Sequence, residues 1–172
     1  MSKLVLMGKL LHQGGKKYIS FCTQSKVHIL PIVSDDDASD EAWVRFSGSL
    51  ETRSIPVENG HRYRKEWFGR GELFPFAPGA YENRVTVECG VVVKVDNLRT
   101  TPLTLRKIVD FVVADGDNYY NCIAFGRTAD KLLKYKHKGS DISIVSAMFH
   151  SREYVKDGEL RTAYEVCVRD FV

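Results

Sequence analysis

The sequence predicts an all-β protein made of two small five-stranded barrels in tandem. Apolar and polar residues alternate along most of the chain, which is typical of half-buried strands. Turn pairs such as Asn59-Gly60 and Asp157-Gly158 separate consecutive alternating segments. The order of the segments in the first half is repeated in the second half. Together these features favour one barrel in each half of the chain.

The first half contains five expected strands. They cover residues 4–11, 18–23, 27–33, 43–53 and 62–73. Gly14 and Gly15 form the turn between the first two strands. Pro31 marks the third as an edge strand, because proline has no N–H to donate to a neighbouring strand. Residues 34–41 form an acidic loop whose spacing differs from that of a calcium-binding EF-hand, so we expect a solvated loop and no metal site.

The second half contains five more expected strands and one helix. The strands cover residues 85–95, 105–113, 119–125, 141–152 and 162–171. In the first of them the odd-numbered residues are apolar and are expected to face the interior, while Gly90 favours a bulge or a bend. A helix is expected after the third strand, because Ala129, Leu132 and Leu133 recur at helical spacing, with Gly139 as its stop.

A five-stranded barrel with a helix between its third and fourth strands has the OB-fold architecture. The expected order of the second half matches it, and in the first half the acidic loop replaces the helix. Matching positions in the two halves, such as Arg53 with Arg152 and Glu66 with Glu165, favour a duplication. A glycine- and proline-rich connection places the boundary near residue 80, which gives units 1–80 and 81–172.

Composition excludes several classes of protein. Of the 172 residues, 44% are hydrophobic and 27% are charged, as expected for a folded chain and not for a disordered one. No run of eighteen apolar residues occurs, so we expect no membrane-spanning helix and a cytoplasmic location. The net charge of +3 is mildly basic and does not by itself indicate a partner.

No motif in the sequence predicts catalysis. A nucleophile turn, a zinc-protease motif and a glycine-rich phosphate loop are all missing from the sequence, so we expect a protein that is not an enzyme and has no cofactor. The cysteines lie in apolar segments without a Cys-x-x-Cys pair, and we expect reduced core thiols in preference to a zinc site or disulfides. They are Cys22, Cys89, Cys122 and Cys167.

Three motifs follow one another along the second half of the chain. Phe125-Gly126-Arg127 leads into the expected helix, which is followed by Lys138-Gly139-Ser140. A strand with Arg152 and Tyr154, a hairpin at Asp157-Gly158 and a strand with Glu165 come next. This arrangement resembles the bacterial single-stranded DNA-binding proteins over residues 84–172 and, in part, over residues 1–74.

The resemblance implies sequence-independent binding of single-stranded DNA in replication, recombination or repair. Such binding uses aromatic rings that stack on unpaired bases and cations that contact phosphates. The usual assembly of the family contains four OB units, so two units in one chain imply a homodimer. The alternative is a monomer that imitates a dimer of single barrels.

Three aromatic residues occupy positions where the family stacks bases, namely Tyr119, Phe125 and Tyr154. Tyr119 and Phe125 lie on the same face of one expected strand, whereas the even-numbered residues 120–124 are expected inside the barrel. The alternative is that Phe125 packs under the helix and that Tyr119 only covers the barrel. Phe111 and Phe149 are expected in the core.

Basic residues near these rings are the expected phosphate contacts. In the second half they are Arg99, Arg106, Lys107, Arg152, Lys156 and Arg161. In the first half they are Arg53, Arg62 and Arg64. For Arg62 and Arg64 the alternative is a solvated hairpin with Trp67 packed inward. Lys131, Lys134 and Lys138 are expected on a solvated face of the helix.

A second interpretation keeps the fold and changes the role of the first unit. That unit would be a protein-interaction or dimerisation module of a primosomal-type replication adaptor. The missing helix, Pro31, the acidic loop and Ile55 at the position of Tyr154 favour this alternative. The sequence ends directly after the last expected strand, so we do not expect replication or repair partners to be recruited through the acidic tail of the family.

Overall fold

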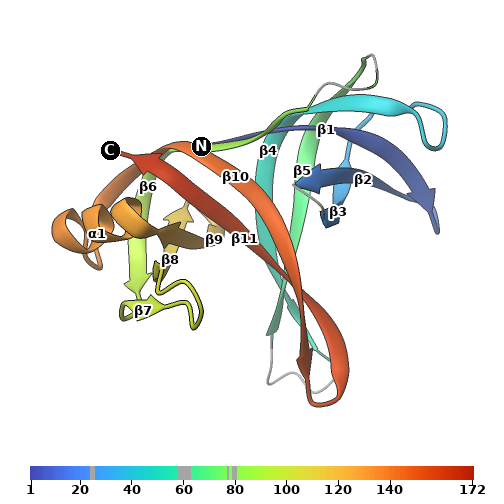
Figure 1. The fold of residues 1–172 in the computed structure, drawn as a ribbon. Helices are drawn as coiled ribbons and strands as arrows, with labels where there is room; N and C mark the ends of the chain where they lie inside the picture. The colour runs from blue at the N-terminus through green and yellow to red at the C-terminus, as the bar shows by residue number, and fades with distance from the viewer. Residues whose placement is uncertain (24–25, 58–62, 77, 79–80) are drawn as a thin grey trace. The chain divides into compact units, whose positions relative to one another are not determined.

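The computed structural model describes residues 1–172 except 24–25, 58–62, 77 and 79–80 (Figure 1). The chain forms two compact units, one of residues 2–84 and one of residues 85–172 together with Met1. Strands dominate both units, and no helix of the described residues is long and apolar enough to cross a membrane. The expected turn at Asn59-Gly60 and the expected contact Arg62 lie outside the described residues.

The first unit contains five long strands. They are β1 (Ser2–Gln13), β2 (Lys16–Thr23), β3 (Lys26–Val33), β4 (Trp43–Pro56) and β5 (Tyr63–Pro75). β1 pairs with β2 through its C-terminal part and with β4 through its N-terminal part, and both pairings are antiparallel. β3 is antiparallel to β2 and parallel to β5, and β5 is antiparallel to β4. Leu6, Leu30, Phe46 and Leu50 belong to the core of this unit.

The second unit contains a closed five-stranded barrel, one short extra strand and one helix. Its elements are β6 (Asn83–Val95), β7 (Arg99–Thr100), β8 (Lys107–Asp115), β9 (Asn118–Phe125), α1 (Gly126–Tyr135), β10 (Asp141–Lys156) and β11 (Glu159–Phe171). The barrel closes because β6 pairs with both β8 and β10, β8 with β9, β9 with β11 in parallel, and β11 with β10. This arrangement fits the OB fold.

β6 differs from the expected strand in the direction of its side chains. Val87 is buried as expected, but after it Gly90 and Val92 are buried instead of the odd-numbered residues. The switch occurs at Cys89, which has a φ of 41°, and the pairing with β10 is irregular there. Gly90 is required by space, because a Cβ atom at this position would lie 2.6 Å from Cγ1 of Val113. The bulge therefore turns β6 and allows it to pair with strands on both sides.

α1 follows the third barrel strand as predicted and buries Ala129 and Leu132. The expectation that Leu133 faces the core is wrong, because Leu133 is exposed. The helix ends at Tyr135, before the predicted stop at Gly139, which has a positive φ in the next turn. Lys131 is partly exposed, as expected for the solvated face of the helix, but it also has partners on β11.

The Lys131 ammonium pairs with Asp170 at 3.1 Å and lies 4.4 Å from the ring centre of Phe171. Thr128 also donates a hydrogen bond to the carbonyl of Arg169. These contacts hold the helix against the end of β11.

Two further expectations are corrected by the structure. Cys22 and Cys89 are exposed and not core residues, because Cys22 lies on the outer face of β2 and Cys89 lies in the bulge; all four cysteines are free thiols. β8 begins at Lys107 and not at Leu105, because Leu105 has a φ of 52° in a turn that Thr101 closes by hydrogen bonds.

Candidate nucleic-acid interface

The outer face of β8 and β9 presents both expected stacking residues of the barrel. Tyr119 lies opposite Ala114 and Phe125 lies opposite Ile108. Tyr119 is 47% exposed, and Asn121, on the same face of β9, is also exposed. The even-numbered residues 120–124 are buried, as predicted from the alternation. One strand therefore carries a tyrosine ring, an amide and a phenylalanine ring along one outer face.

Phe125 is partly exposed and is covered by a cation. The Arg106 guanidinium lies 4.4 Å from the centre of its ring. Arg106 follows the turn at residues 101–105, whereas Phe125 ends β9 and caps α1. A base could stack here only on the guanidinium plane or after Arg106 moves aside.

The hairpin of β10 and β11 separates its side chains into two different faces. Tyr154 lies opposite Arg161, and Lys156 lies opposite Glu159, so these residues share one face with Arg152. Tyr154 is 39% exposed. Val155 and Leu160 oppose each other on the second face, where both are exposed. The expected aromatic and basic residues of the hairpin thus lie on one side of it.

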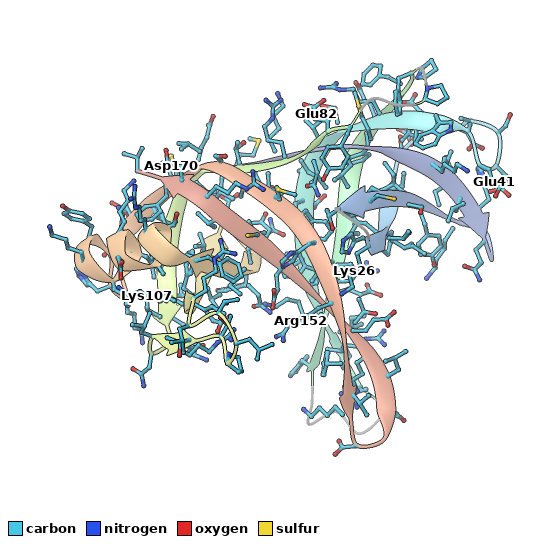
Figure 2. All side chains as sticks on the ribbon, in the orientation of Figure 1. Lys26, Glu41, Glu82, Lys107, Arg152 and Asp170 are labelled. Atoms are coloured by element: carbon cyan, nitrogen blue, oxygen red, sulfur yellow. The ribbon has the colours of Figure 1, made fainter. Side chains whose placement is uncertain are left out.

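A cavity of about 500 Å³ joins this hairpin to the outer face of the barrel. Figure 2 marks Arg152 on the hairpin and Lys107 at the start of β8. The polar side chains that line the cavity are Lys94, Asp96, Arg99, Asp110, Asn121, Arg152 and Glu165. Their three cations and three carboxylates are paired. The sequence analysis missed Lys94 and Asn121, although Asn121 has the same position in the alternation as Tyr119.

Two arginines on the cavity wall are held by carboxylates. The Nε atom of Arg99 donates to Asp110 at 2.8 Å, and this hydrogen bond raises the pKa of Arg99 above its ordinary value. The Nε atom of Arg152 lies 2.9 Å from Oε1 of Glu165. Both expected phosphate contacts therefore line the cavity with part of their hydrogen-bonding capacity already used.

Glu165 is a buried carboxylate with two partners. Nε2 of His150 lies 2.9 Å from its Oε2 atom, while Arg152 contacts the other oxygen. Burial alone would raise the pKa of Glu165, but the hydrogen bond from His150 and the charge of Arg152 outweigh this effect and lower the pKa below its usual value. Glu165 is thus ionised at neutral pH despite being buried.

The other expected cations of the second unit lie in different surroundings. Lys107 pairs with Asp130 of α1 at 3.0 Å, and Arg161 lies 3.6 Å from Glu159. Lys156 is exposed near the tip of the hairpin. These pairs are on the surface, where an ion pair typically contributes at most about 1 kcal/mol, so a phosphate could compete for their cations.

In the first unit, Arg53 and Arg70 both lie near one aromatic ring. Their guanidinium carbons lie 5.3 and 5.5 Å from the ring centre of Phe68. Arg53 also pairs with Glu66 at 2.6 Å. Arg64 lies on the same face and is exposed, whereas Trp67 is buried as expected. This ring therefore already has two cations close to it.

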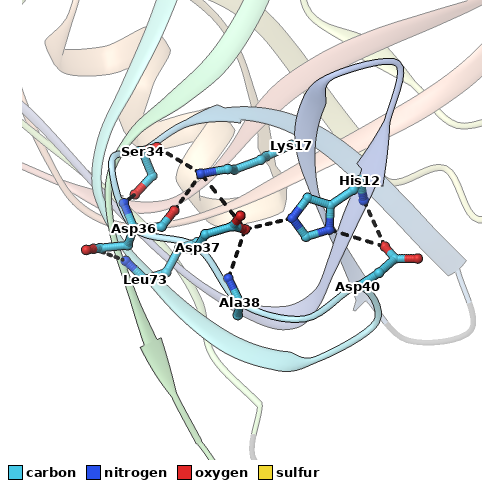
Figure 3. Close-up of polar contacts among 8 residues, drawn as sticks. All are labelled: His12, Lys17, Ser34, Asp36, Asp37, Ala38, Asp40 and Leu73. Carbon is cyan, nitrogen blue, oxygen red and sulfur yellow. Dashed lines mark hydrogen bonds and ion pairs between the residues drawn. The ribbon is translucent and has the colours of Figure 1, made fainter.

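The acidic loop of the first unit is held by basic side chains (Figure 3). His12 contacts Asp37 at 2.7 Å and Asp40 at 3.4 Å through its two ring nitrogens. Nζ of Lys17 donates to the carbonyl of Asp36 at 2.6 Å.

The side-chain hydrogen bond between His12 and Asp37 raises the pKa of His12 and lowers the pKa of Asp37. The pKa of Asp40 is lowered mainly by the hydrogen bond that it accepts from the backbone N–H of His12. The loop is solvated as expected, since Asp37 and Asp40 are both more than half exposed, although these carboxylates also have basic partners. The described residues contain no metal-ligand cluster.

No family model matches the sequence, and no curated protein matches it. Solved structures do resemble the fold. The wild-type single-stranded DNA binding protein from Thermus aquaticus has a TM-score of 0.71 and 15% identity, and the match covers 100% of this chain and 92% of that chain. A deletion mutant of the same protein gives a TM-score of 0.71 at 16% identity and covers 93% of that chain.

The SSB domain of a Synechococcus sp. protein covers only 54% of this chain, with a TM-score of 0.43 and 14% identity. At these identities the likeness concerns the fold. The match to the Thermus aquaticus protein extends through both units of the chain.

Proposed function

We propose that this chain binds single-stranded DNA independently of base sequence, in replication, recombination or repair. The main support is the outer surface of the second unit, where two exposed tyrosines share strand faces with residues that line a cavity of about 500 Å³. Tyr119 shares its face with Asn121, and Tyr154 shares its face with Arg152. Exposed rings beside cations are the combination that non-specific single-strand binding uses. The fold likeness to a single-stranded DNA binding protein supports the same function.

We also propose that the two units are OB-fold barrels arranged in tandem. In the first unit β1 pairs with β2 and β4, which matches the pairing of β6 with β8 and β10 in the second. A parallel pairing of β3 with β5 corresponds to that of β9 with β11. Equivalent pairings in the same order support a duplicated barrel, with a boundary near residue 80.

A titration with labelled oligonucleotides tests the function directly. Fluorescence anisotropy would be recorded with oligothymidylate of about forty nucleotides, which exceeds the length that two OB-fold sites need. A duplex of equal length is the control. We expect tight binding to the single strand that weakens steeply with salt, and weak binding to the duplex. Equal affinity for both, or none at low salt, would refute the proposal.

A second candidate function concerns the first unit alone. On the outer face of β3, Val27, Ile29 and Val33 are exposed, where β9 instead carries Tyr119 and Phe125. An apolar outer face favours contact with protein over contact with nucleic acid. The first unit would then serve dimerisation or protein interaction in a replication adaptor of primosomal type.

Point variants of the full chain distinguish the two candidates. Arg53→Ala with Arg64→Ala removes cations from the first unit, and Arg152→Ala removes one from the second. If both units bind DNA, each variant lowers affinity for oligothymidylate. If the first unit is an interaction module, only Arg152→Ala does so.

A further inference from the structure

Several arginines of this protein are bound by carboxylates in the same way. In Arg152 the Nε atom, and not a terminal nitrogen, lies 2.9 Å from Glu165. Arg53 uses Nε toward Glu66 at 2.6 Å. Arg161 differs, because its contact with Glu159 is longer, at 3.6 Å, and uses a terminal nitrogen. The Nε contact therefore distinguishes Arg152 from a neighbouring arginine on the same hairpin.

An Nε pair between the fourth and fifth barrel strands occurs in both units. In each unit the arginine lies on the fourth strand and the glutamate on the fifth. The register differs, because Glu66 lies directly opposite Arg53, whereas Glu165 lies opposite His150 and reaches Arg152 diagonally. Of the two arginines, Arg152 of the second unit is the one that lines the cavity.

The chemistry of the guanidinium group gives this contact a consequence. Arginine has five N–H donors in a rigid planar arrangement, one on Nε and four on the terminal nitrogens. A carboxylate at Nε leaves the terminal edge available and fixes the direction in which that edge points. Phosphates are bound best by two parallel N–H groups of one guanidinium.

Glu165 is well suited to hold the group. It is buried, and its second oxygen is fixed by His150 at 2.9 Å. Arg152 itself is largely exposed and lines the cavity. The Glu165 carboxylate is therefore held in place, whereas the Arg152 side chain that it contacts is exposed.

We propose that Glu165 is a positioning residue for DNA binding, which orients Arg152 so that its terminal N–H groups meet a phosphate of the strand. This inference rests on the proposed function and goes further, because it assigns a favourable role to a negative charge within a DNA site. Simple electrostatics predicts the opposite effect on DNA affinity, since removing a carboxylate should strengthen binding to a polyanion.

The test compares two substitutions with the same change in charge. Glu165→Gln removes the carboxylate at Nε, whereas Glu159→Gln removes an exposed carboxylate from the same face of the hairpin. Affinity of the full chain for labelled oligothymidylate is measured at several salt concentrations. We expect Glu165→Gln to weaken binding about threefold or more, as for an arginine left unfixed, and Glu159→Gln to strengthen it slightly. Strengthening by both would overturn the proposal.

A double-mutant cycle separates positioning from a general structural effect. In the Arg152→Ala background, Glu165→Gln should weaken binding no further, because the residue through which it acts is gone. An equal loss in both backgrounds would overturn the proposal. If Glu165→Gln does not retain a cooperative thermal transition, the affinity of the Arg152→Lys variant tests the proposal instead. A lysine ammonium that contacts Glu165 has no planar edge with two parallel N–H groups left for a phosphate, so the loss should approach that of Arg152→Ala.

Full affinity of the Arg152→Lys variant would overturn the proposal. The wild-type titration distinguishes a failure of the proposed function from a failure of the positioning role. If the wild-type chain does not bind oligothymidylate at low salt, the proposed function itself fails. If it binds and Glu165→Gln binds more tightly, only the positioning role fails.

Discussion

The tyrosine rings of the second unit are exposed although burial of their apolar surface would stabilise the fold. Tyr119 and Tyr154 lie on different strands, one on β9 and one on the β10–β11 hairpin. Both are on faces that also carry polar or charged groups of the cavity. Their exposure is consistent with a surface on which a planar ligand can stack.

Removing both rings should therefore weaken DNA binding without unfolding the chain. We expect the Tyr119→Ala, Tyr154→Ala variant to lose at least about tenfold in affinity for oligothymidylate, since each stacked base contributes about 1–3 kcal/mol. Anisotropy titration measures the loss. Tyr135→Ala is the control, because Tyr135 is an exposed tyrosine on α1. An unchanged affinity of the double variant would exclude the two rings from the site.

If Arg152 contacts a phosphate, the salt dependence of DNA binding will report this contact. Each phosphate contact on a single strand changes the slope of log K against log salt by about 0.7. Arg152→Ala should lower affinity and reduce the slope by roughly this amount. A slope equal to that of the wild type would show that Arg152 makes no phosphate contact.

At the scale of single elements, the acidic loop is anchored in a pH-dependent way. The pKa of His12 is raised above its ordinary value of 6.5 by Asp37 and Asp40, so its contribution to stability is complete below that value and is lost as pH rises through the folded pKa. The pKa values of Asp37 and Asp40 are lowered from 3.8, so their contribution is lost as pH falls below that value.

The stability of the first unit should consequently fall as pH rises above 6.5. The His12→Gln variant should lack this part of the decline, because a glutamine has no charge to lose. Denaturant unfolding at pH 6 and at about pH 8 measures the difference. Equal pH dependence in the variant and the wild type would mean that His12 does not anchor the loop.

The bend of β6 leads to a second prediction about an element. A methyl group at Gly90 would meet Val113 of the neighbouring strand β8, so Gly90→Ala should destabilise the second unit by about 1–3 kcal/mol through overpacking. Val91→Ala is a matched control at the adjacent exposed position. Chemical denaturation reports both values. A neutral Gly90→Ala change would mean that the barrel wall relaxes at no cost.

The same strand, β6, contains a feature that could not be predicted from the sequence. Alternation located the ten long strands, because each buries one face, and helical spacing located the helix. Alternation could not locate the switch at Cys89, since Val91, Val92 and Val93 are all apolar and any of them could face the core.

The shared outer face of Tyr119 and Phe125 followed from the alternation of β9, whereas the stacking role of these rings and of Tyr154 was implied by the family resemblance. The pairing of Arg152 with Glu165 followed from neither, because it depends on the register between β10 and β11.

At the scale of the whole molecule, two barrels in one chain would supply half of an assembly of four. We propose a homodimer, and sedimentation equilibrium should then give a mass of twice 19.5 kDa. The exposed valines of β3 are the candidate contact in the first unit. Val27→Asp with Val33→Asp should shift the mass toward one chain, whereas Val145→Asp on β10 should not. A mass of one chain in the wild type would contradict the dimer.

Each unit carries one exposed thiol, Cys22 on β2 and Cys89 on β6. Cys122 is buried, and burial raises the pKa of Cys167, so both react more slowly with maleimides. A donor and an acceptor dye would thus attach to the native sequence at one defined place in each unit. Energy transfer between the dyes would report how an oligonucleotide changes the separation of the two units, with no engineered cysteine.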